Sequence, residues 1–188
     1  MSSHLATDTP SSWVARFLPL IPAGEVLDLA CGSGRHARLL AQQGHRVLAV
    51  DRDAGALALA SGPGIATEQR DLEAEGMAWP YEEGRFAGIV VTNYLHRPLF
   101  PHLFLSLAPG GVLIYETFAV GNEQFGKPSN PAFLLREGEL IELAMRDDAM
   151  RVIAFEDGYV EVPRPALVQR ICAIKSAGAL EPARRRLA

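Results

Sequence analysis

The sequence has little cysteine, no excess of positive charge and no long apolar run. Cys31 and Cys172 are its only cysteines among 188 residues, and they have neither the spacing of a metal site nor the number of a disulfide framework. This usage favours a reducing compartment, so we expect a cytoplasmic protein. No stretch reaches the roughly 18 consecutive apolar residues of a membrane span. The polar first ten residues lack the pattern of a signal peptide.

The charge balance argues against a nucleic-acid partner. The formal net charge is −4, so the chain carries no strong basic field, although a local basic patch stays compatible with this number. With 48% hydrophobic and 21% charged residues, the composition is that of an ordinary globular domain. We expect one domain over residues 1–188, with a flexible tail at 178–188.

The pattern of apolar stretches predicts alternating strands and helices. Ser11 is a candidate cap for a short helix that Pro19 and Pro22 end, which gives an N-terminal helical extension over residues 1–22. Strands are expected at 25–30, 45–51, 65–72, 86–92, 112–118, 150–162 and 166–176. Helices are expected at 35–44, 54–60, 98–107 and 136–147, and the "APGG" stretch at 108–111 is expected to form a turn.

This order predicts an α/β fold. Alternating strands and helices favour a parallel sheet with helices on both faces. The link between the last two strands, Pro163–Pro165, is too short for a crossover, so these strands are expected to form an antiparallel hairpin. The fold class is therefore a three-layer, Rossmann-like, doubly wound sheet of seven strands, mostly parallel with a C-terminal antiparallel hairpin. Ligands of such sheets bind beyond the carboxyl ends of the strands.

A glycine turn follows the first expected strand. "GSGRHA", residues 32–37, matches the G-x-G-x-x-G/A pattern of dinucleotide sites, and Asp51 has the spacing of a ribose-binding acid. In "VLDLACGSG", however, Asp28 is followed by Ala30, Gly32 and Gly34 at every second position. A carboxylate at Asp28 is unfavourable beside a pyrophosphate but favourable beside an ammonium or sulfonium group.

The alternating acid and small residues resemble motif I of the class I S-adenosylmethionine-dependent methyltransferases. The resemblance extends over residues 25–176 and includes "QRDL" (69–72), "FAGIVVTNYL" (86–95), "LAPGGVLIYE" (107–116) and the terminal hairpin. It implies that Asp51 binds both ribose hydroxyls and that Asp71 accepts from the adenine amino group. The small size most resembles compact small-molecule methyltransferases, tellurite-resistance-like proteins among them.

The resemblance implies S-adenosylmethionine as cofactor, S-adenosylhomocysteine as product and direct in-line transfer to a small-molecule acceptor. The residues expected to bind the cofactor are Asp28, Ala30, Cys31, Gly32, Gly34, Asp51, Arg52, Asp71, Leu72, Asn93 and Tyr94. Plainer interpretations are also open: Cys31 as a packing residue, and Asp51 as the cap of the helix at Ala54.

Other functions stay open at this point. A nucleic-acid or protein methyltransferase would be supported by a basic cluster around Arg97, Lys127 and Arg136. "NYLHRPLF" (93–100) lacks the Asn-Pro-Pro-aromatic pattern of enzymes that methylate base or glutamine amines, which makes those acceptors less favoured. A non-catalytic cofactor-binding subunit and a nicotinamide-dependent oxidoreductase are the remaining alternatives.

Three residues are candidates for removing a proton from the acceptor: His96, Tyr115 and Glu116. Histidine is the side chain that most often serves as a general base, but His96 is equally placed to cap the next helix. Arg97 is expected to bind either an anionic substrate or a carboxylate of the protein.

The segment 119–135 is too long for an ordinary connection, which is typical of a substrate loop or lid. In that case Phe125, Lys127 and Asn130 would enclose the substrate; the alternative is a mobile surface loop.

Overall fold

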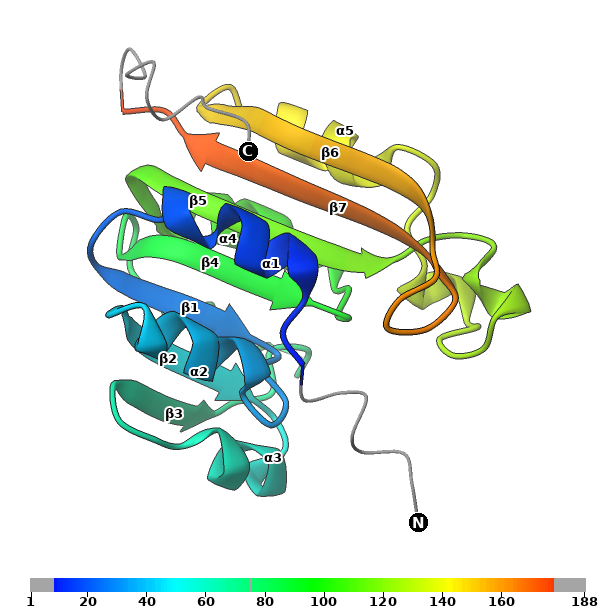
Figure 1. Ribbon diagram of the computed structural model, residues 1–188. Coiled ribbons are helices and arrows are strands. Elements are labelled where there is room, and N and C mark those ends of the chain that lie inside the picture. Colours follow the sequence, from blue (N-terminus) through cyan, green and yellow to red (C-terminus); the bar gives the residue numbers. More distant parts are fainter. Residues whose placement is uncertain (1–8, 75, 178–188) are drawn as a thin grey trace.

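The chain folds into a seven-stranded sheet with helices on both faces (Figure 1). The structure, a computed structural model, describes residues 9–74 and 76–177. The strands are β1 (Glu25–Leu29), β2 (Arg46–Asp51), β3 (Ile65–Gln69), β4 (Phe86–Thr92), β5 (Leu107–Phe118), β6 (Met150–Val160) and β7 (Ala166–Lys175). The α-helices are α1 (Ser12–Phe17), α2 (Arg35–Gln42), α3 (Ala54–Ala60), α4 (Phe100–Ser106) and α5 (Glu139–Met145).

The strand order is β3-β2-β1-β4-β5-β7-β6. Pairing is parallel from β3 to β5, whereas β7 pairs antiparallel with both β5 and β6. The predicted doubly wound sheet with an antiparallel terminal hairpin is therefore confirmed. The order reverses between β1 and β4, so the switch point lies at the carboxyl ends of these two neighbouring strands.

Two apolar cores cover the two faces of the sheet. One face packs α1, α2 and α3 against side chains such as Val26 and Val90. The other face packs α4 and α5 against side chains such as Leu27 and Leu29. Because side chains alternate along a strand, Asp28 follows Val26 onto the α1 and α2 face.

Local signals explain the boundaries of α1 and the end of α2. The Ser11 side chain accepts a hydrogen bond from the Trp13 amide and caps α1, as expected, and a 3₁₀ turn, η2 (Leu18–Leu20), follows with Pro19 in its first turn. Gly44 lies just beyond the end of α2 with a φ of 89°, as expected of a helix stop.

Among the expected boundaries that were wrong, two have a local physical reason. Residues 108–111 lie within β5 and do not form a separate turn. They interrupt the pairing with β4, since Phe86 pairs with Leu107 before them and Gly88 pairs with Val112 after them. The third strand ends at Gln69 instead of Leu72, and the Asp71 carboxylate there accepts a hydrogen bond from the Glu73 amide, which starts a turn.

The segment 119–135 is tied down at both ends. The Val120 amide donates to the Leu135 carbonyl, and the Leu135 amide donates to the Phe118 carbonyl. Asn122 is buried and bonds the Pro128 carbonyl and the Leu167 amide. The segment also contains two 3₁₀ turns, η4 (Asn122–Gln124) and η5 (Pro131–Phe133).

Within the described ranges, no helix has the length and apolarity needed to cross a membrane. The expected tail at 178–188 and the first eight residues of the N-terminal extension lie outside the described residues.

Candidate functional site

The glycine turn between β1 and α2 has a backbone that favours glycine. Gly32 and Gly34 have φ angles of 54° and 80°, and Ala30 also has a positive φ, 53°. A Cβ on Gly34 would lie 2.5 Å from the Cβ of Ala60, whereas a Cβ on Gly32 would meet nothing within 4 Å. Gly34 therefore permits close packing on α3, and Gly32 keeps space open beside the turn.

Alanine substitutions should separate these two roles. We expect Gly34→Ala to lower the free energy of unfolding by about 2–4 kcal/mol, because the strained φ adds to a clash with Ala60. Gly32→Ala should lower it by only about 1–2 kcal/mol, from the backbone strain alone. Urea unfolding of both variants measures the two free energies. Equal losses would contradict the prediction, because they would show that the clash with Ala60 does not destabilise the fold.

The Asp51 carboxylate at the end of β2 fixes the turn in space. One oxygen accepts a hydrogen bond from the Gly32 amide at 2.8 Å and the other accepts from the Asp53 amide at 3.0 Å. The cap of α3 is Asp53, whose carboxylate accepts from the Gly55 and Ala56 amides, so the alternative interpretation of Asp51 as that cap was wrong.

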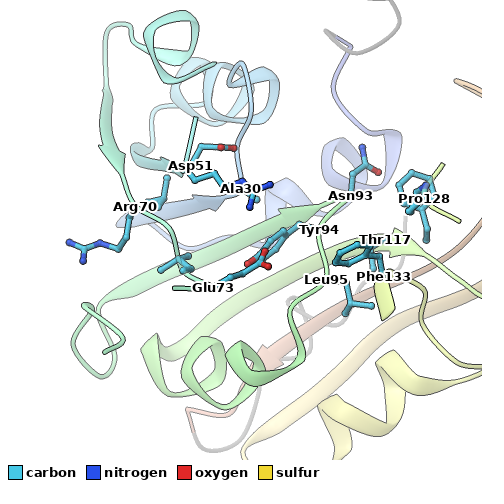
Figure 2. A pocket seen from close by; sticks show the side chains of 14 residues that line it. Ala30, Asp51, Arg70, Glu73, Asn93, Tyr94, Leu95, Thr117, Pro128 and Phe133 are labelled. Atoms are coloured by element: carbon cyan, nitrogen blue, oxygen red, sulfur yellow. The ribbon is translucent and has the colours of Figure 1, made fainter. Parts of the chain in front are cut away.

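A cleft of about 470 Å³ opens at the carboxyl ends of the strands (Figure 2). We call it the main cleft; it extends from the ends of β1 and β2 to the segment 119–135. The predicted cofactor residues that line it are Ala30, Asp51, Arg52, Leu72, Asn93 and Tyr94. Figure 2 shows Asp51 beside Ala30 at one end, Tyr94 in the middle and Phe133 and Pro128 at the other end.

Sequence reasoning missed part of this lining. Further residues in it are Arg70, Glu73, Leu95, Thr117, Phe118, Pro128 and Phe133. The length of the segment 119–135 was the available signal for the last two. Of the residues proposed there to enclose substrate, Phe125 instead contacts Tyr159, with ring centres 5.3 Å apart, and Asn130 caps η5.

Asp28, in β1, and Cys31, in the turn, are buried and do not line the main cleft. Asp28 is 1% exposed, and one of its oxygens has no hydrogen-bond partner among the described residues. Burial raises the pKa of Asp28 to about 7, an effect that a hydrogen bond from the Ala37 backbone reduces. Burial also raises the pKa of the Cys31 thiol, which fits its interpretation as a packing residue. Asp71 is exposed outside the cleft lining.

The three candidate bases do not line the main cleft. Tyr115 is 1% exposed on the α4 face, donates its hydroxyl to the Tyr94 carbonyl at 2.8 Å and stacks on Phe100; burial raises its pKa. The Glu116 carboxylate lies 3.4 Å from the Arg170 guanidinium. His96 precedes the 3₁₀ turn η3 (Arg97–Leu99) without capping it through its side chain.

Arg97 binds a carboxylate of the protein. Its guanidinium donates to both oxygens of Glu139, at 2.6 and 2.8 Å, and Glu139 is 3% exposed. It also donates to the carbonyls of Ala132 and Leu134, on either side of Phe133. Arg97 thereby holds the cleft-lining part of the segment 119–135 against α5.

A smaller cavity of about 210 Å³ adjoins the main cleft. Asn93 and Phe118 line both spaces. The other walls of this second chamber come from residues 9–12, the start of α2, and the ends of β6 and β7 with the turn between them. Glu116, which lies outside the main cleft, lines the second chamber.

A buried histidine that the sequence did not single out holds this region together. The His36 Nε2 accepts a hydrogen bond from the Ser11 amide at 3.0 Å, and its Nδ1 lies 3.4 Å from the Thr92 hydroxyl. Burial and the charge of Arg35 lower the pKa of His36 to about 3, so the ring is neutral at physiological pH. The residues before α1 are therefore fixed to α2 beside the second chamber.

A sheet of order 3-2-1-4-5-7-6 with one reversed strand, and a cleft beyond its switch point, defines the class I S-adenosylmethionine-dependent methyltransferase fold. The chain belongs to the family described as "Methyltransferase domain", whose model matches residues 2–162. This confirms the family expected from the motifs.

Known proteins agree with this assignment. The chain is 36% identical over 127 residues to a protein-L-isoaspartate O-methyltransferase of Chlorobaculum tepidum, covering 65% of this chain and 55% of that protein. It is 36% identical over 107 residues to a trans-aconitate 2-methyltransferase of Paracidovorax citrulli, covering 53% and 40%. The structure of TehB from Haemophilus influenzae superposes with a TM-score of 0.72 at 20% identity, covering 89% of this chain and 63% of that one. The chain thus spans about half the length of the curated relatives it matches.

Proposed function

We propose that the protein transfers a methyl group from S-adenosylmethionine to a small-molecule acceptor. The observation that carries the proposal is the Asp51 carboxylate, which lines the main cleft and is held by the Gly32 and Asp53 amides. A carboxylate accepts from two neighbouring hydroxyls at once, which suits a ribose.

The residues present fit this cofactor. Asp51 would hold the ribose, Leu72 would supply an apolar wall for the adenine, and Asn93 and Tyr94 would line the methionine end. The open space beside Gly32 allows a ligand to approach the backbone of the turn. When bound, the sulfonium supplies an activated methyl group, so the protein mainly has to position the acceptor and exclude water.

The turn itself argues against a nicotinamide dinucleotide. A pyrophosphate needs free backbone N–H groups at the start of the helix. Here the Cys31 amide donates to the Val50 carbonyl, the Gly32 amide to Asp51, and the Gly34 amide to the Cys31 carbonyl. These three donors of the turn are used within the protein, and the Ala37 backbone at the start of α2 bonds the Asp28 carboxyl.

A small acceptor is supported by the modest volumes of the two cavities and by relatives named as trans-aconitate 2-methyltransferases. A protein acceptor, as in the name of the isoaspartate relative, is the second candidate. The basic cluster that would favour nucleic acid is partly compensated, because Arg97 and Arg136 both contact the single carboxylate of Glu139.

Thermal unfolding with S-adenosylhomocysteine and, separately, with NAD tests the proposal. A ligand at about 100 times its Kd adds roughly 2.7 kcal/mol of stability, which raises Tm measurably. We expect a shift with S-adenosylhomocysteine alone. A shift with NAD alone, or no shift with either ligand, would contradict the proposal.

A further inference from the structure

We infer that the second chamber binds a carboxylate group of the methyl acceptor and that Arg164 is the residue that contacts it. This inference rests on the methyltransferase function proposed above. It adds the chemical class of the acceptor and a specificity-determining residue.

The second chamber is placed to hold an acceptor. It meets the main cleft at Asn93 and Phe118, at the ends of β4 and β5. The chain turns sharply there, because Asn93 has a φ of 56° and its amide donates to the Glu116 carbonyl at 2.9 Å. A molecule in the second chamber would therefore lie beside a cofactor in the main cleft.

The charge of the chamber favours an anion. Three arginines, Arg35, Arg164 and Arg170, and one carboxylate, Glu116, line it. Arg170 is compensated, since it lies 3.4 Å from Glu116 and 3.6 Å from Glu156.

Arg164 has N–H donors available for a ligand where the two cavities meet. It lies in the exposed turn between β6 and β7 and forms no ion pair with any described residue. Its guanidinium lies 5.4 Å from the centre of the Phe118 ring and donates one hydrogen bond, to the Lys127 carbonyl at 3.2 Å. A guanidinium has five N–H donors in a planar fork that matches a carboxylate. Arg164 thus presents a cation next to the ring that both cavities share.

The carboxylates that line the two cavities are already engaged, which indicates an acceptor that needs no base. They are Asp51, Glu73 and Glu116. Backbone amides hold both oxygens of Asp51, Arg170 pairs with Glu116, and Glu73 interacts with the Tyr94 hydroxyl. A carboxylic acid with an ordinary pKa of about 4 is already ionised at neutral pH.

The reaction then balances without proton transfer. A carboxylate oxygen of the acceptor forms a bond to the methyl carbon, the bond from that carbon to sulfur breaks, and its electron pair stays on sulfur. The products are a methyl ester and S-adenosylhomocysteine.

The test measures binding and product chemistry on the full chain. Succinate and citrate should raise the Tm of the S-adenosylhomocysteine complex at constant ionic strength, whereas uncharged dimethyl succinate should not. Arg164→Gln should abolish this shift while S-adenosylhomocysteine still binds. The control is Arg151→Gln, which replaces an exposed arginine on β6 outside both cavities and should keep the shift.

In turnover with a panel of carboxylic acids, Arg164→Gln should raise KM about 10- to 100-fold with little change in kcat. The product should release methanol in mild alkali.

Different outcomes separate the two proposals. S-adenosylhomocysteine binding without any response to carboxylates would overturn this inference alone. So would a product stable to alkali, or an Arg164→Gln variant that behaves like the Arg151→Gln variant. Absence of S-adenosylhomocysteine binding by the unmodified protein would overturn the proposed function, and this inference with it.

Discussion

Asp51→Ala should weaken S-adenosylhomocysteine binding by about 100- to 1000-fold, because two charge-assisted hydrogen bonds to the ribose are lost. The variant also loses the acceptor for the Gly32 amide, which fixes the glycine turn at 2.8 Å from the carboxylate. Isothermal titration calorimetry measures the Kd directly. The fold should persist, since Asp51 lies at the end of β2 and not within either apolar core.

Asp53→Ala is the matched control for this loss. It lies two residues away and caps α3 through hydrogen bonds to the Gly55 and Ala56 amides. We expect it to lower the free energy of unfolding by about 1 kcal/mol and to leave the Kd essentially unchanged. Comparable losses of affinity in both variants would show that Asp51 acts through the local fold and not through the ligand.

Arg97→Met should lower the free energy of unfolding by about 2–4 kcal/mol, because it leaves the buried Glu139 carboxylate without its main partner. The estimate is below that for a fully buried pair, since the Arg97 side chain is 35% exposed. The variant also releases the carbonyls on either side of Phe133, so the main cleft should bind S-adenosylhomocysteine more weakly. Chemical unfolding monitored by circular dichroism checks the stability.

Arg85→Met provides the comparison at the surface. Arg85 pairs with Glu25 at 2.8 Å, but both side chains are partly exposed, so its loss should cost less than about 1 kcal/mol. Equal losses of unfolding free energy in both variants would show that burial of Glu139 does not make its ion pair with Arg97 stronger than the surface pair.

The pH dependence gives a second check on the same pair. Hydrogen bonds from Arg97 lower the pKa of Glu139 from 4.5 to about 2. A carboxyl with a lowered folded-state pKa contributes its full stability above pH 4.5 and loses it as the pH falls toward 2. Glu139→Gln should therefore be less stable than the unmodified protein at pH 6, and the difference should shrink between pH 4.5 and 2.

Prediction from the sequence worked best where the signal is local in the chain. The glycine turn, the cap at Ser11 and the alternation of strands and helices depend on neighbouring residues and were confirmed. Ala30, Asp51 and Leu72 line one cleft because parallel strands bring their carboxyl ends to one edge of the sheet. The sequence by itself therefore determined the fold class and the edge of the sheet at which the candidate site lies.

Only the tertiary structure decided which polar groups face the cavities and which are paired. Asp28 and Tyr115 belong to strands that end at the site, yet packing on the two faces of the sheet buries them. Arg97 meets Glu139 across 42 positions of sequence, and Arg164 reaches Phe118 from the turn between β6 and β7. Such contacts depend on how the helices and the terminal hairpin pack against the sheet, which no short stretch of sequence encodes. The charge of the second chamber follows from that packing, because pairing with Glu116 and Glu156 compensates Arg170 while Arg164 remains available to a ligand.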